Sequence, residues 1–141
     1  SGTTTTLSSS DIPGHNKFIL STSSPYDWRT PQNNNLWQGV NGMNNPCPPG
    51  WRIPTRAEWN TELASWATKD PAGAFASPLK LPLTDYRSDS TGTFQTASGM
   101  YWTTTVSESY AYALAVGSIW GANVEQKPHR AGGCSVRCVK D

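Results

Sequence analysis

Three cysteines constrain the fold of this chain more than any other feature of its sequence. Cys47 opens the segment CPPGWRIPTRAEW, whereas Cys134 and Cys138 lie four positions apart near residue 141, on what we predict to be one strand. Residues four apart in a strand are roughly 13 Å apart, and the Cα atoms of a disulfide lie within about 7 Å. We therefore pair Cys47 with Cys138 and expect Cys134 to be a free thiol. The alternative is a cytosolic protein with reduced cysteines.

The composition is that of one domain and excludes several kinds of partner. Only 15% of the 141 residues are charged, against about 25% in an average soluble protein, while seven Trp and five Tyr supply many large side chains. A net charge of +1, with scattered Lys and Arg, offers no footprint for nucleic acid or an anionic membrane. No apolar run approaches the ~20 residues that span a bilayer, so we expect no membrane insertion.

The first ten residues are rich in Thr and Ser and lack the basic start and apolar core of a signal peptide. Such low-complexity composition is typical of linkers. We predict a linker over residues 1–10 and a single domain over residues 11–141. The domain is expected to be a monomeric module of a longer chain.

One helix is strongly indicated after Pro54. Thr55 and Glu58 have the spacing of a capping box, and Trp59, Leu63 and Trp66 recur at helical spacing. The helix should bury this aromatic face and end near residue 69, because the residue before Pro71 is disfavoured in a helix.

The rest of the chain is predicted to form short strands and loops, which gives an α+β fold with one main helix. Trp28, Leu36 and Trp37 are expected to anchor an irregular Asn- and Pro-rich segment, and Trp51 and Trp102 to lie in the core. Alternating or β-prone side chains predict strands at residues 17–22, 79–83, 101–106, 111–116 and 135–139.

Three motifs carry a resemblance to a known family. CPPGWRIPTxxEW at 47–59, YWTTT at 101–105 and SVRCV at 135–139 resemble the Fibrobacter succinogenes major paralogous domain family, over residues 17–141. The resemblance implies a C-type-lectin-like fold of short antiparallel strands and long loops, and a bond between Cys47 and Cys138. It also implies a ligand-binding module of a large secreted or surface bacterial adhesin, or the receptor-binding module of a phage or appendage. The chain departs from the family at Cys134 and at Thr84-Asp85.

The same resemblance places a ligand face on two loops, residues 84–99 and 117–132. We predict that Trp120 and Tyr110 offer stacking surfaces and that Arg87 offers a charge for a carboxylate. Calcium is the one cofactor the loops could hold, since it takes oxygen ligands from flexible segments. Its predicted ligands are Asp85, Asp89, Asn123 and Glu125. The partner would be a peptide or glycan on a host or neighbouring cell.

Other interpretations of these loops stay open. Residues 89–92 (DSTG) read equally well as a hairpin turn. The Trp-Asn-Asp and Glu-Pro-Asn triplets of calcium-dependent sugar-binding lectins are missing from the sequence, which disfavours that geometry. The Asn-rich segment 32–45 is the alternative location for a site.

We expect no catalytic residue. The segment 52–59 also resembles formylglycine-generating oxidases, and Cys134 lies between Arg130 and Arg137, but the chain is about half the size of such enzymes. Neither His15 nor His129 has a nucleophile motif around it, and no zinc-ligand spacing occurs. The sequence therefore favours a binding module over an enzyme.

Overall fold

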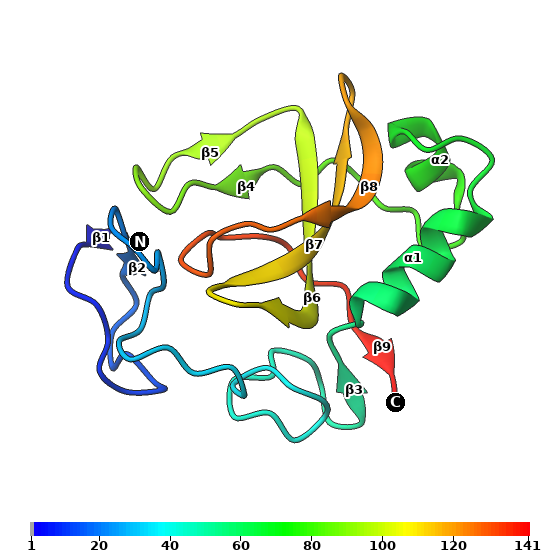
Figure 1. The fold of residues 1–141 in the computed structure, drawn as a ribbon. Helices are drawn as coiled ribbons and strands as arrows, with labels where there is room; N and C mark the ends of the chain where they lie inside the picture. Colours follow the sequence, from blue (N-terminus) through cyan, green and yellow to red (C-terminus); the bar gives the residue numbers. More distant parts are fainter. Residues whose placement is uncertain (1) are drawn as a thin grey trace.

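The centre of the fold is a three-stranded antiparallel sheet in the order β6–β7–β8 (Figure 1). The computed structural model describes residues 2–141. Strands β6 (Ser98–Ser107) and β7 (Tyr110–Gly117) confirm two predicted strands and extend both. Strand β8 (Gly121–Gln126) lies inside the segment that we expected to be a loop. The α+β class and the antiparallel pairing of the main sheet are therefore confirmed.

The main helix begins where the sequence predicts. Helix α1 (Arg56–Ser65) has Thr55 as its N-cap, and the Thr55 side chain accepts from the backbone N–H of Glu58, which completes a capping box. The helix ends before Lys69, not at it. The Lys69 ammonium instead donates to the carbonyls of Leu63 and Trp66, which satisfies the open end of the helix.

A second, short helix was not predicted. Helix α2 (Pro71–Ala76) has Asp70 as its N-cap, and the Asp70 carboxylate accepts from the backbone N–H of Gly73 at 2.8 Å. That hydrogen bond lowers the pKa of Asp70. A capping Asp followed by Pro at the first helical position is a helix-start signal that our sequence reasoning used only as a stop.

The main core lies between the helices and one face of the sheet. Trp59 is 2% exposed and its indole N–H donates to the carbonyl of Trp102 at 3.2 Å. The predicted aromatic face of α1 is thus confirmed as core. The cluster of buried side chains consists of Trp59, Leu63, Trp66, Ala74, Leu81, Tyr101, Leu114, Val116 and Val124.

Strand β7 is buried on both faces. Leu114 and Val116 belong to the cluster on the helix side, and the alternate residues Ala111, Ala113 and Ala115 point to the other face. Ala111 there lies beside Trp102 and the irregular segments that precede α1. The sheet therefore has a second packed face without helices.

The disulfide joins Cys47 to Cys138 with a Cα–Cα distance of 5.8 Å, and Cys134 is free, as predicted. Next to it, β3 (Trp51–Arg52) pairs antiparallel with β9 (Val139–Lys140). The predicted strand at 135–139 is shorter than expected, because Ser135 makes only an isolated bridge to Tyr101. Trp51 is 39% exposed, so its assignment to the core was wrong: the two-stranded β3–β9 ribbon leaves one face in water.

Arg52 joins this ribbon to the start of α1. Its guanidinium donates two hydrogen bonds to the Glu58 carboxylate, at 2.8 and 2.7 Å, and one to Asp141 at 2.7 Å. The hydrogen bonds from Arg52 lower the pKa of Glu58 to about 2, and those that Arg52 donates raise its own pKa. The Glu58 carboxylate also accepts from the backbone N–H of Thr55 at 2.8 Å, so one carboxylate caps the helix and holds the ribbon.

Residues 2–10 differ from the predicted linker. Strand β1 (Thr3–Thr4) pairs parallel with β2 (Phe18–Ile19), and Ser8 bridges to Arg29 and is buried. The strand predicted at 17–22 is thus real but short. In Figure 1, β1 and β2 lie on the opposite side of the central sheet from α1 and β9.

The segment 79–83 is also not a strand. Lys80 has a positive φ of 51°, which breaks the extended backbone that alternation implied. Leu81 is nevertheless buried, and its backbone N–H donates to Ala74 of α2 at 3.1 Å. The alternating pattern of residues 79–83 therefore reflects the burial of Leu81 and not a strand in a sheet. None of the helices in the described part of the chain has the length and apolarity to cross a membrane.

Candidate ligand-binding face

A hollow lies where the β4–β5 hairpin meets the β7–β8 turn; we call it the Trp120 hollow. Strands β4 (Tyr86–Arg87) and β5 (Phe94–Gln95) form the hairpin. The hollow has a volume of about 490 Å³. Its lining is Tyr86, Gln95, Thr96, Ala97, Ser98, Met100, Ile119, Trp120 and Gln126, and none of these residues is charged.

The Trp120 ring rests directly on the backbone of Gly117. A Cβ atom placed on Gly117 would lie 2.4 Å from the indole, a distance that real Cβ contacts do not show. Gly117 and Gly121 pair across the turn, and Gly121 has a positive φ of 73°. These glycines let a three-residue turn fold the indole back onto the sheet, so the ring is held as a preformed platform.

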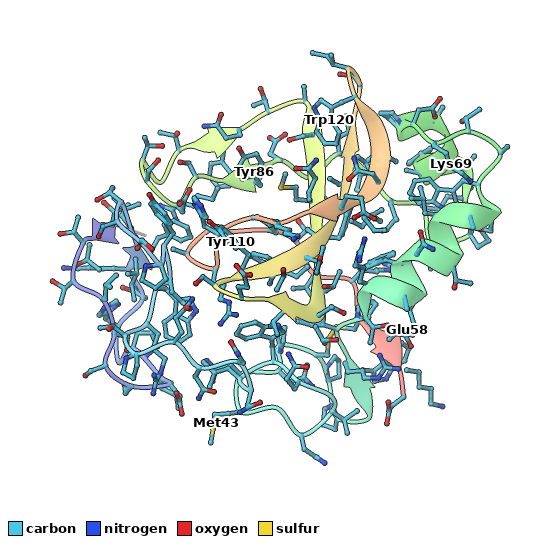
Figure 2. All side chains as sticks on the ribbon, in the orientation of Figure 1. Met43, Glu58, Lys69, Tyr86, Tyr110 and Trp120 are labelled. Carbon is cyan, nitrogen blue, oxygen red and sulfur yellow. A yellow bond between two sulfur atoms is a disulfide. The ribbon has the colours of Figure 1, made fainter. Side chains whose placement is uncertain are left out.

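The platform is open to a ligand. Trp120 is 46% exposed and its neighbour Ile119 is 92% exposed, both at the tip of the β7–β8 turn. In Figure 2, Trp120 lies near the top of the sheet and Tyr86 lies on the adjacent β4. The remaining wall offers amide and hydroxyl groups from Gln95, Ser98 and others, which both donate and accept hydrogen bonds.

The structure brings the two predicted loops together at this hollow, at the strand pair of Ser98 with Gly117, and at a side-chain contact. The Asp89 carboxylate lies 2.6 Å from His129 Nδ1. The His129 ring stacks between Tyr26, at 4.2 Å between centroids, and Tyr110, at 5.4 Å. Asp89 and Tyr110 therefore already have partners within the chain. The alternative interpretation of residues 89–92 as a hairpin turn is confirmed, since Gly92 N–H donates to Ser88 and joins β4 to β5.

Arg87 and Asp85 lie outside the Trp120 hollow. The Arg87 guanidinium stacks on Phe18, 4.2 Å from the ring centroid, and donates to the Gly92 carbonyl at 2.7 Å. Arg87 thus ties the hairpin to β2, away from the hollow. Asp85 has a positive φ of 57°, and its backbone N–H donates to Ser98 at 2.8 Å. Asp85 occupies a turn conformation that short polar residues tolerate.

Asn123 and Glu125 are on β8, away from the hollow. The Glu125 carboxylate is paired with Arg56 of α1, and Asn123 Oδ1 accepts from the backbone N–H of Glu125 at 3.0 Å. Strand β8 was not predicted, so the fixed direction of these side chains was not foreseen. Of the proposed ligand residues, Trp120 alone lines the hollow.

The four oxygen donors predicted for calcium come from separate parts of the structure: Asp85 precedes β4, Asp89 is in the β4–β5 turn, and Asn123 and Glu125 are on β8. Asp89 lies against His129 and Glu125 is paired with Arg56, so two of these carboxylates already have partners within the chain. Across residues 2–141, no three His, Cys, Asp or Glu side chains are grouped as metal ligands.

Cys134 and His15, which were considered for catalysis, are held by burial or by hydrogen bonds, and so are amides of the Asn-rich segment. Burial raises the pKa of the Cys134 thiol to about 12, which keeps it protonated and a poor nucleophile. His15 Nδ1 accepts from the backbone N–H of Lys17 at 3.2 Å in a local turn. In the Asn-rich segment, Asn44 and Gln38 donate to backbone carbonyls of Asp11 and Thr104, so these amides hold the fold.

Sequence reasoning missed most of the hollow. Gln95, Ala97 and Met100 carry no motif, and their placement depends on the β4–β5 hairpin. One signal was available: Ile119-Trp120 is an apolar pair between two glycines, at a turn where polar residues are usual. An exposed apolar pair at a turn is a candidate contact surface.

Comparison with known proteins leaves this site to be interpreted on its own geometry. No protein family matches the sequence, and no match was found among curated proteins or among solved structures.

Proposed function

We propose that the chain is a non-catalytic carbohydrate-binding module with a C-type-lectin-like fold, and that the Trp120 hollow binds a neutral sugar. One observation carries the proposal: an exposed indole, fixed on Gly117, faces a wall with amide and hydroxyl groups and no charge. One face of a pyranose ring presents C–H groups, which are attracted to the face of an indole, and its rim presents hydroxyls. The hollow matches both.

The lining also favours a sugar over the acidic or terminal group of a peptide. Arg87, which was to receive a carboxylate, is held by Phe18 and Gly92. A charged ligand group would enter a hollow without a counter-ion and would lose hydration. We therefore propose a neutral glycan, bound without calcium, and treat peptide binding as an alternative result of the test.

The wider context of the module is proposed on two grounds. The Cys47–Cys138 disulfide is the kind of bond that persists in oxidising, extracellular compartments. The motifs at 47–59, 101–105 and 135–139 resemble a family of bacterial surface domains with a C-type-lectin-like fold. Together they support a secreted or surface adhesin that attaches to glycans of a host or neighbouring cell. The receptor-binding module of a phage or appendage is the rival context.

A glycan array tests the proposal, with and without a calcium chelator, using the wild type and three variants. Trp120→Ala removes the platform, and Gly117→Ala keeps the indole but displaces it; each should weaken binding at least tenfold. Phe94→Ala is the matched control, because this 68%-exposed aromatic side chain lies on the same hairpin outside the hollow.

Retained binding in the chelator and in Phe94→Ala would support the assignment. Binding that survives both Trp120→Ala and Gly117→Ala would place the site elsewhere. Loss of binding in the chelator would contradict the calcium-independent reading, and selective capture of peptides would contradict the class of ligand.

A further inference from the structure

A second pocket lies on the helix-free face of the sheet, and we call it the tryptophan pocket. Its volume is about 280 Å³, equivalent to roughly nine water molecules at ~30 Å³ each. Three indoles, those of Trp28, Trp37 and Trp102, line it. Its other lining residues are Asn44, Pro46, Ile53, Ala111, Arg130 and Val136. An apolar pocket with few polar groups is the usual form of a small-molecule site.

Arg130 is the polar group that sets the chemistry of this pocket. It is 5% exposed, and its guanidinium stacks on Trp37 at 5.4 Å from the ring centroid. Nη2 donates to the carbonyls of Glu108 and Tyr110, at 2.8 and 3.3 Å. Nε and Nη1 are buried and have no hydrogen-bond partner among the described residues. Such unpaired donors are costly to bury, so an acceptor that reaches them gains free energy.

The charge of Arg130, in contrast to its hydrogen bonds, is already balanced. Asp27 is 3% exposed, and its Oδ2 lies 3.7 Å from Nη1, which is close enough for attraction but too long for a hydrogen bond. Asp27 Oδ2 instead accepts from Gln32 Nε2 at 2.8 Å. A carboxylate added beside this pair would bring an unbalanced buried negative charge. Arg130 therefore has a nearby opposite charge in Asp27 but lacks hydrogen-bond acceptors for Nε and Nη1.

We propose that the tryptophan pocket binds a small uncharged molecule with an aromatic or branched aliphatic body and one carbonyl acceptor, such as a primary amide. The body packs between the three indoles, and the carbonyl oxygen accepts from the guanidinium of Arg130 after that side chain shifts to uncover Nε or Nη1, which are both covered in the free structure. A molecule of about ten non-hydrogen atoms, close to the number of waters that would fill the pocket, matches the volume. This site is separate from the Trp120 hollow and shares no lining residue with it.

The test uses phenylacetamide, phenylacetate and phenethylamine, which share one body and differ in charge and acceptor. Binding is followed by NMR through the indole N–H signals, assigned by Trp→Phe variants. Phenylacetamide should bind more tightly than both others and shift the signals of Trp28, Trp37 and Trp102, but not Trp120. Stronger binding of phenylacetate or phenethylamine, or no binding of any probe, would overturn the proposal.

Two variants check the location. Val136→Trp fills the pocket from its 37%-exposed rim without removing a buried charge, and should abolish binding. Arg130→Lys removes the guanidinium donors and should weaken binding roughly tenfold or more. Trp120→Ala should leave binding unchanged, which separates this site from the Trp120 hollow. If Arg130→Lys does not fold, Val136→Trp decides; unchanged binding in Val136→Trp would refute the location.

Discussion

The Glu58 carboxylate should make the stability of the domain depend on acid pH. Its pKa is lowered from 4.5 to about 2 by the hydrogen bonds from Arg52 and Thr55. A lowered folded-state pKa means that the ionised carboxylate favours the folded state, so this stabilisation is present above pH 4.5. It is lost as the pH falls from 4.5 towards 2, where the folded-state carboxyl also takes up a proton.

The magnitude follows from the shift. A difference of about 2.5 units corresponds to roughly 3.4 kcal/mol at 1.36 kcal/mol per unit. The Glu58 side chain is 41% exposed, so water and salt screen much of this. We therefore expect about 1–2 kcal/mol.

Glu58→Gln tests this reasoning, because it keeps the size of the side chain and removes its charge. In urea unfolding, the variant should be about 1–2 kcal/mol less stable than the wild type at pH 7, and the difference should shrink towards zero near pH 2. Glu108→Gln is the matched control: its side chain is exposed and makes no hydrogen bond in the described chain, so its effect should be small at every pH. An equal loss at pH 7 and pH 2.5 in Glu58→Gln would refute the ionic explanation.

Two further predictions concern the core and the thiols. Trp59→Ala should cost roughly 3–5 kcal/mol in unfolding free energy, because the side chain is 2% exposed; unchanged thermal stability would mean that the helix does not pack on the sheet through Trp59. Alkylation in denaturant without reductant should label Cys134 alone, and labelling in the native state should be slow because burial raises its pKa to about 12; three labels would mean that the disulfide does not form.

Local signals predicted the elements whose partners are close in sequence. Thr55 and Glu58 specify the start of α1 by contacts within one turn, and the β-prone run around Tyr101 needs little more than its own side chains. For the disulfide, spacing excluded only the pair formed by Cys134 and Cys138, and the family resemblance also pointed to Cys47 and Cys138.

Elements that depend on distant partners were not predicted. Thr3–Thr4 is a strand only because Phe18–Ile19 lies beside it, and a Thr-rich sequence does not indicate which segment it pairs with. Trp51 has the large apolar side chain typical of a core residue, but the narrow β3–β9 ribbon leaves it exposed.

The candidate site shows the same limit. Glu125 and Asp89 look like free oxygen ligands in the sequence, and only the fold reveals that Arg56 and His129 face them. The Trp120 platform was foreseen as a residue, but its neutral surroundings come from a hairpin more than twenty residues earlier.

The disulfide also determines how the domain would respond to mechanical tension. A pull on Asp141 reaches Cys138 after three residues and passes straight to Cys47, 91 positions earlier in the chain. The intervening polypeptide, about 300 Å long when fully extended, is therefore shielded from stretching. Helix α1, the central sheet and the Trp120 hollow all lie between the two bonded cysteines. Tension applied to the ends of the chain would therefore extend residues before Cys47 and after Cys138, while the disulfide keeps the force off these elements.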